Sequence, residues 1–204
     1  MTMYPISLAK QLVSTLNPVE AARFSFENYH AVGLDYLCLL RTDVLTVKAY
    51  FFREDRKCQP GGDVDWIVWP HNHRYAFEHM TVFGTIRNHR FAIVEGRTHD
   101  LYAYDAEKRR PVSIATCGLK EIVRETTKAG ESFSMPLTDE IHTLSFGSRQ
   151  AVAIQLQYAD TREQTAMVVP RGEIVRCALN TALYQKPTVE QVSSWTAELK
   201  EVLR

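Results

Sequence analysis

The segment WPHNHRYAFEHM, residues 69–80, holds three of the chain's seven histidines among aromatic and apolar residues. Side chains alternate between the two faces of a β-strand, so His71 and His73 point the same way if this segment is extended. Two imidazoles on one face can chelate a metal ion, and imidazole suits iron, nickel, copper and zinc. Histidines at this spacing also pack in ordinary strands, so a metal site needs further ligands.

Two further residues are candidates to complete such a site. Glu78 follows His73 by five residues, an odd offset that places it on the opposite face unless a turn or bulge resets the alternation. His142 comes much later, after Pro136 and a polar turn, at the start of an apparent strand. The four candidate metal ligands are therefore His71, His73, His142 and Glu78.

The elements that must position these residues are mainly strands. From residue 43 onward, short runs rich in β-branched and aromatic residues alternate with turn clusters, a pattern typical of a sandwich or barrel of antiparallel strands. Residues 1–42 are expected to be helical, with Asn17 as a cap and Pro18 at the first helical position. The chain ends in an amphipathic pattern after Pro187 and Thr188, which predicts a C-terminal helix.

Composition narrows the classes of partner. The chain has 204 residues, with 24 basic and 24 acidic side chains and no long run of either sign. This balance gives no electrostatic signature for nucleic acid or an anionic membrane, so a small-molecule partner is expected. No secretory signal and no stretch of about 20 apolar residues is present, and the four cysteines form no Cys-x-x-Cys pair. We expect one soluble, cytoplasmic domain.

The spacing of His71-Asn72-His73, Glu78 and Gly84, followed by the compact segment from Pro136 to His142, resembles the two motifs of the cupin superfamily. The resemblance covers roughly residues 43–158. It implies a mostly-β fold, the cupin double-stranded β-helix or jelly-roll barrel, with N-terminal helical segments and a C-terminal helix. Residues 1–204 would form a single domain: a helical cap over 1–42, a barrel over 43–158 and an extension with a helix over 159–204.

The register of the first motif leaves the ligand set open between three and four. Gly84 follows Glu78 one residue sooner than in the usual cupin pattern, and alignment backward from Gly84 puts Phe77 at the glutamate position. In that register Phe77, His79 and Thr81 face inward and Glu78 faces outward. Three-histidine cupins occur in the thiol dioxygenase branch, related to cysteine dioxygenase, and the segment AVAIQLQY resembles the strand after the last ligand there.

This chain departs from that branch beside the metal. Where the branch carries Ser-x-His-x-Tyr, the natural alignment gives Ala153, Gln155 and Gln157, with Tyr158 one place off. Gln155, Gln157 and Tyr158 are therefore candidates to orient a substrate. Arg53, after an apparent strand, is a candidate to clamp a carboxylate bidentately, with a solvated strand end as the alternative.

These residues predict a metal-dependent cupin enzyme. The first hypothesis is a mononuclear non-haem iron dioxygenase or oxygenase that acts on a small thiol, phenol or carboxylate with O2. The cofactor would be Fe(II), with Ni, Mn, Cu or Zn as alternatives. The alternatives in function are a non-oxidative isomerase, lyase or decarboxylase that uses the metal as a Lewis acid, or a module that binds a small ligand. A homodimer, with the terminal helix covering its seam, is also left open.

Overall fold

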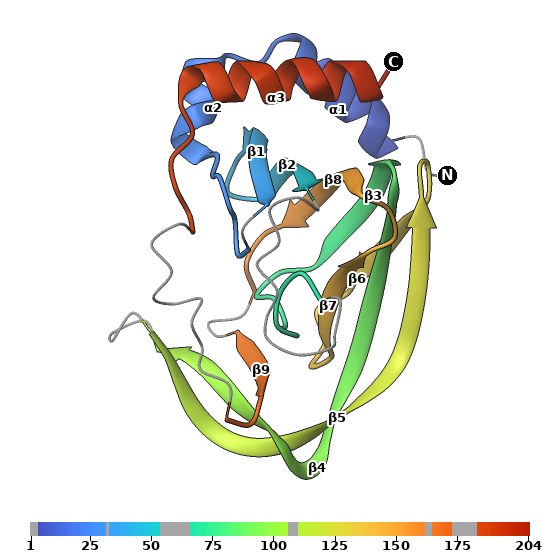
Figure 1. The fold of residues 1–204 in the computed structure, drawn as a ribbon. Coiled ribbons are helices and arrows are strands. Elements are labelled where there is room, and N and C mark those ends of the chain that lie inside the picture. Colours follow the sequence, from blue (N-terminus) through green and yellow to red (C-terminus); the bar gives the residue numbers. More distant parts are fainter. Residues whose placement is uncertain (1–3, 32, 54–65, 106–109, 162–164, 173–182) are drawn as a thin grey trace.

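The computed structural model describes residues 4–31, 33–53, 66–105, 110–161, 165–172 and 183–204 (Figure 1). Helices lie at both ends of the chain and strands between them. The helices are α1 (Tyr4–Ser14), α2 (Pro18–Phe24) and α3 (Val189–Val202). The strands are β1 (Leu34–Arg41), β2 (Leu45–Arg53), β3 (Phe77–Phe83), β4 (Thr85–Asp105), β5 (Arg110–Lys128), β6 (Ser132–Met135), β7 (Ile141–Phe146), β8 (Gln150–Tyr158) and β9 (Ala166–Pro170).

The strands form two antiparallel sheets. One has five strands in the order β1-β2-β8-β3-β6, and the other has the order β5-β4-β7, with β9 pairing to β4. In Figure 1 the long β4–β5 hairpin curves around the side of the molecule away from the helices. This hairpin, β7 and β9 enclose a shared interior with the five-stranded sheet.

The five-stranded sheet is buried on both faces, and alternation along its strands assigns each side chain to one of them. Phe51 and Met80 belong to a core cluster that also contains Trp195 of α3, so this face packs under the helices. Tyr50 and Phe52 belong to a second cluster on the interior face. Because side chains alternate along a strand, His79 and Thr81, on either side of Met80 in β3, must face the interior.

The helices cover the outer face of this sheet and have well-defined starts. The Asn17 side chain accepts hydrogen bonds from the backbone at the start of α2, whose first residue is Pro18. Thr188 and Gln191 form a reciprocal capping box at the start of α3. These caps satisfy backbone N–H groups that would otherwise lack partners, which explains why both helices begin where the sequence predicts.

Gly84 makes the tight connection between β3 and β4. It has a φ of +74°, and a Cβ there would lie 2.2 Å from the carbonyl oxygen of Gln150. Only glycine fits this close approach without moving the backbone. The turn aligns β3 in the first sheet with β4 in the second.

The expected fold class is confirmed in its general form, a mostly-β structure of antiparallel sheets with helices before and after. Three local expectations are wrong. β1 lies within residues 1–42, which were expected to be helical, and β9 lies within the C-terminal extension. The polar RNHR segment, residues 87–90, is typical of a solvated hairpin turn by its sequence, but it lies inside β4.

The cysteines and the helices agree with further sequence-based expectations. Cys38 and Cys117 are free thiols, both buried, whereas Cys58 and Cys177 lie outside the described residues. Within the described part of the chain, no helix combines the length and apolar character needed to cross a bilayer.

Candidate metal centre

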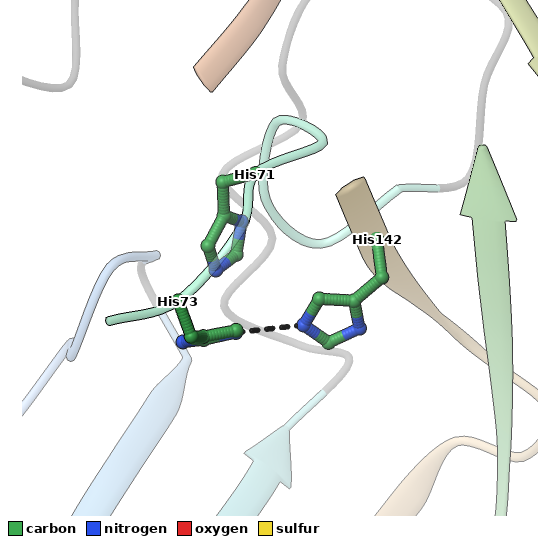
Figure 2. Close-up of side chains that lie close together, drawn as sticks. All are labelled: His71, His73 and His142. Atoms are coloured by element: carbon green, nitrogen blue, oxygen red, sulfur yellow. Dashed lines mark hydrogen bonds between the residues drawn. The ribbon is translucent and has the colours of Figure 1, made fainter. Parts of the chain in front are cut away.

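Three histidines from two distant segments converge in the interior. The candidate ligand nitrogens of His71, His73 and His142 all lie within 4.8 Å of one another (Figure 2). The backbone of His71 pairs with that of His142 through two hydrogen bonds of 2.9 and 2.8 Å, which locks the first segment to the start of β7. Asn72, between the two histidines, bonds through its backbone and side chain to Ala166 of β9.

Neighbouring hydrogen bonds fix the proton positions on two of the rings. His71 Nδ1 lies 2.8 Å from the carbonyl oxygen of Trp69, which can only accept, so this nitrogen carries the proton. Asn88 Oδ1 accepts a 2.9 Å hydrogen bond from His142 Nδ1 in the same way. In both rings Nε2 therefore keeps its lone pair, which is the form that binds a metal.

A hydrogen bond to His142 positions the ring of His73. His73 Nε2 lies 2.8 Å from His142 Nε2, as the dashed line in Figure 2 shows. Because His142 Nε2 carries no proton, His73 donates this hydrogen bond. Two nitrogens bound to one ion at about 2.1 Å and a right angle would lie about 3.0 Å apart, so an ion fits here if it replaces that proton.

Burial keeps the three imidazoles neutral. It lowers the pKa of His71, although the hydrogen bond to Trp69 partly opposes the shift. The pKa values of His73 and His142 fall well below the ordinary range, first through burial and then through the neighbouring histidines. Neutral imidazole is the ligating form, so the three side chains are ready to bind a metal at neutral pH.

A cavity of about 40 Å³ lies beside the three histidines. Its walls are aromatic and aliphatic side chains, histidines and one amide, and none of the described carboxylates lines it. The lining residues are His30, Leu34, Tyr50, Phe52, Val68, His71, His73, Phe77, His79, His142, Leu144 and Gln155. An ion held by the three histidines would have a small, mostly apolar space next to it.

Glu78 does not join this cluster. It is exposed on the outer face of β3, where it accepts a 2.8 Å hydrogen bond from the Tyr158 hydroxyl. Phe77 and His79 on either side are buried and line the cavity. The alternation of β3 thus follows the register in which Glu78 points outward, and the geometry gives no support to a fourth ligand there.

The four residues proposed to orient a substrate are separated by the fold. Gln155 is buried and lines the cavity. Gln157 shares the parity of Gln155 on β8 but is not among the lining residues, and Tyr158 is on the outer face with Glu78. Arg53 forms ion pairs with Asp35 and Glu198, so it ties α3 to the sheet and does not line the cavity.

Other residues lie at the site without having been chosen as site residues from the sequence. His30 is 6.0 Å from His71 between ring centroids and bonds through Nδ1 to the Tyr184 hydroxyl at 2.5 Å. Asn88 orients His142 from β4. For His79 the inward register of β3 was a signal, whereas nothing in the local sequence marks His30 or Asn88.

No protein-family model and no curated protein sequence matches this chain. Solved structures do match, including the Schizosaccharomyces pombe Cnp3 cupin domain, with 8% identity and a TM-score of 0.36 over 63% of this chain and 66% of that one. Fe(II) HppE matches with 15% identity and a TM-score of 0.40 over 70% and 58%.

Hydroquinone 1,2-dioxygenase from Sphingomonas sp. TTNP3, with 4-hydroxybenzoate bound, matches with 12% identity and a TM-score of 0.38 over 70% and 72%. The chain spans less than two thirds of the Cnp3 and HppE structures. At these scores the likenesses assign no activity to this chain.

Proposed function

We propose that this protein is a mononuclear metal-dependent enzyme of cupin type, a non-haem iron oxygenase that acts on a small organic substrate. The observation that carries the proposal is the convergence on one cavity of three imidazoles, one buried and two partly buried, that are neutral at physiological pH. Their candidate ligand nitrogens lie close enough together to share one ion.

The ligand set suits a reactive ion better than a structural one. Structural zinc sites are closed by four protein ligands, whereas three ligands leave positions for a substrate. Iron(II), when bound to these histidines, supplies the one-electron chemistry that allows dioxygen to react with an organic molecule. The neutral histidines leave the full double charge of a divalent ion uncompensated, which favours an anionic substrate.

The chain's own residues prepare the space around the ion. Phe52, Phe77 and Leu144 present apolar surface to the cavity and exclude water from it. Exclusion of water strengthens each remaining polar interaction with the substrate. Asn88 and the Trp69 carbonyl hold the protons of His142 and His71 on the nitrogens that face away from the ion.

One observation favours non-oxidative chemistry as a second candidate. Lys48 lies 3.4 Å from the hydroxyl of Tyr50, which lines the cavity, and burial lowers the pKa of Lys48 to about 7. A lysine and tyrosine pair of this kind can move a proton at neutral pH. An isomerase, lyase or decarboxylase with a Lewis-acid metal would use such a pair.

The test is metal analysis of protein purified without an affinity tag, paired with oxygen uptake after anaerobic loading with iron(II). The proposal expects about one metal ion per chain, and oxygen uptake that a small thiol, phenol or carboxylate accelerates. Tight zinc or nickel without oxygen uptake would overturn the oxygenase and favour Lewis-acid chemistry. Absence of bound metal after loading with each of these ions would overturn both.

A further inference from the structure

A row of polar side chains crosses the interior face of the five-stranded sheet. Lys48 of β2 pairs in register with Gln155 of β8, and Gln155 pairs with His79 of β3. All three are at most 5% exposed, and Gln155 and His79 line the cavity beside the metal-binding histidines. An amine, an amide and an imidazole thus lie side by side on the interior face of the sheet.

His79 is unsatisfied in this position. The side chain is 1% exposed, and neither ring nitrogen has a hydrogen-bond partner within the described residues. Gln155 lies near enough to influence the ring but outside hydrogen-bond geometry, and the ring stacks on Phe133 at 4.7 Å and meets Phe52 edge-on at 6.3 Å between centroids. A buried polar group without a partner lowers the stability of the fold, so its retention calls for a reason.

The hydrogen-bond donors that His79, Gln155 and Tyr50 offer indicate what kind of ligand they bind. Burial lowers the pKa of His79 to about 4, so the ring is neutral and offers one N–H donor. The Gln155 amide offers further N–H donors. Tyr50 Oη lies within hydrogen-bond distance of the Lys48 amine, and burial raises the pKa of Tyr50 well above its ordinary value, so its O–H can also donate. Donors predominate, which suits an acceptor group on the ligand.

Size and charge restrict that acceptor. A water-sized group takes roughly 10–15 Å³, so the cavity of about 40 Å³ holds a group of about three non-hydrogen atoms, and the rest of a larger ligand extends through its open side. A carboxylate has three. Among the described residues no acidic side chain lines the cavity, and a divalent ion held by three neutral histidines would add positive charge.

We propose that His79 and Gln155, with the Tyr50 hydroxyl, form the binding site for the carboxylate group of the substrate. The substrate of the proposed enzyme is then a small carboxylic acid whose remaining part faces the metal. This inference rests on the proposed function only in that it calls the ligand a substrate. The carboxylate site itself does not require a metal. His79 acts in binding and not as a metal ligand.

The test uses metal-free protein, so that a carboxylate cannot bind through the ion. Acetate and benzoate are titrated by calorimetry at pH 7.5, beside their neutral isosteres acetamide and benzamide. Histidines labelled with ¹⁵N report whether the His79 ring resonances move. We expect the acids to bind at least tenfold more tightly than the amides and to shift the His79 resonances.

Two variants locate the site, and one is a matched control. His79→Leu and Gln155→Leu are expected to weaken benzoate binding at least tenfold, whereas Glu78→Gln, on the outer face of the same strand, leaves it unchanged. Because the His79 nitrogens lack partners, His79→Leu should keep or raise the unfolding midpoint, so a folding failure is not expected. Unchanged benzoate binding in both leucine variants, or equal binding of acids and amides, would overturn the inference.

Metal content of the same proteins keeps the two proposals separate. Carboxylate binding at His79 in a protein that takes up no metal would refute the enzyme and leave the site standing. Stoichiometric metal with no carboxylate preference in the metal-free protein would refute the site and leave the enzyme standing. His79→Leu should bind metal as the wild type does, and loss of metal in that variant would make His79 a ligand and overturn its assignment as a carboxylate donor.

Discussion

The Asn88 side chain is oriented by Glu125 and in turn orients the ring of His142. Its Nδ2 donates to Glu125 Oε1 at 2.8 Å, and its Oδ1 accepts from His142 Nδ1 at 2.9 Å. A carboxylate can only accept, so the amide nitrogen must face Glu125 and the amide oxygen must face His142. The proton of His142 is therefore held on Nδ1, and Nε2 is left for a metal ion.

This relationship predicts the effect of replacing Asn88. Asn88→Leu should lower metal affinity by about 10- to 100-fold, because the ligand ring loses the acceptor that fixes its tautomer. Asn88→Asp retains an acceptor for His142 but faces the Glu125 carboxylate, so it is combined with Glu125→Gln, and this double variant should lose much less. Competition with a chromophoric chelator measures both. Equal affinities in the two variants would show that the hydrogen bond does not matter for binding.

The ligand set gives a second prediction. His71→Ala and His142→Ala should each abolish stoichiometric metal binding, whereas Glu78→Ala should retain it, because Glu78 faces outward and bonds to Tyr158. Metal content after dialysis against trace metal is the measurement. Equal loss in all three variants would restore a four-ligand site, and full retention in His142→Ala would remove the proposed centre.

Arg53 gives a third prediction, which tests its structural role. Arg53→Gln should lower the free energy of unfolding by roughly 1–3 kcal/mol, because Asp35 is almost fully buried and loses a charged partner. Metal and benzoate binding should not change. Arg23→Gln, which breaks an exposed ion pair with Glu20, is the matched control and should cost little. Weaker benzoate binding in Arg53→Gln would instead favour a substrate clamp.

The buried histidines make the stability of the metal-free protein depend on pH. Burial lowers the pKa of His30 to about 3 and that of His79 to about 4, below the unfolded value near 6.5. Below pH 6.5 the unfolded chain therefore binds more protons, and folding stability falls as the pH decreases towards 4. Urea unfolding between pH 7.5 and 4.5 should show this fall, with a shallower slope in His79→Leu. An identical slope in that variant would contradict the assignment.

The buried Lys48 amine should also make folding stability fall as the pH decreases, but over a higher pH range than the histidines. Four tyrosine rings, those of Tyr29, Tyr36, Tyr50 and Tyr75, lie 5.2–5.8 Å from its amine. Burial lowers its pKa from 10.5 to about 7, so stability falls as the pH decreases from about 10.5 towards 7.

Replacement by an apolar side chain should remove that dependence. Lys48→Met is expected to be more stable than the wild type at pH 7.5, with a flatter profile between pH 7 and 9, because no buried amine then needs to lose its proton. Lys10→Met, at an exposed position of α1, should change neither quantity. A less stable Lys48→Met would show that the tyrosine rings more than offset the cost of burial.

The sequence by itself determined the elements whose signals are local. The caps at Asn17 and Thr188 set the helix starts, and Gly84 set the turn after β3. Alternation before Gly84 gave one of two possible registers, the one with His79 inside and Glu78 outside, and the structure follows it. These features depend on residues a few positions apart, whose geometry is fixed by backbone sterics and hydrogen bonding.

Only the tertiary structure decided which polar groups meet. Register between distant strands brought His142 to His71 and His73, and placed Lys48, Gln155 and His79 in one row. It also placed Asn88 near the start of β4 and turned Arg53 towards Glu198 of α3. Pairing between strands far apart in the chain depends on the packing of the whole core, so it cannot be predicted from local sequence patterns.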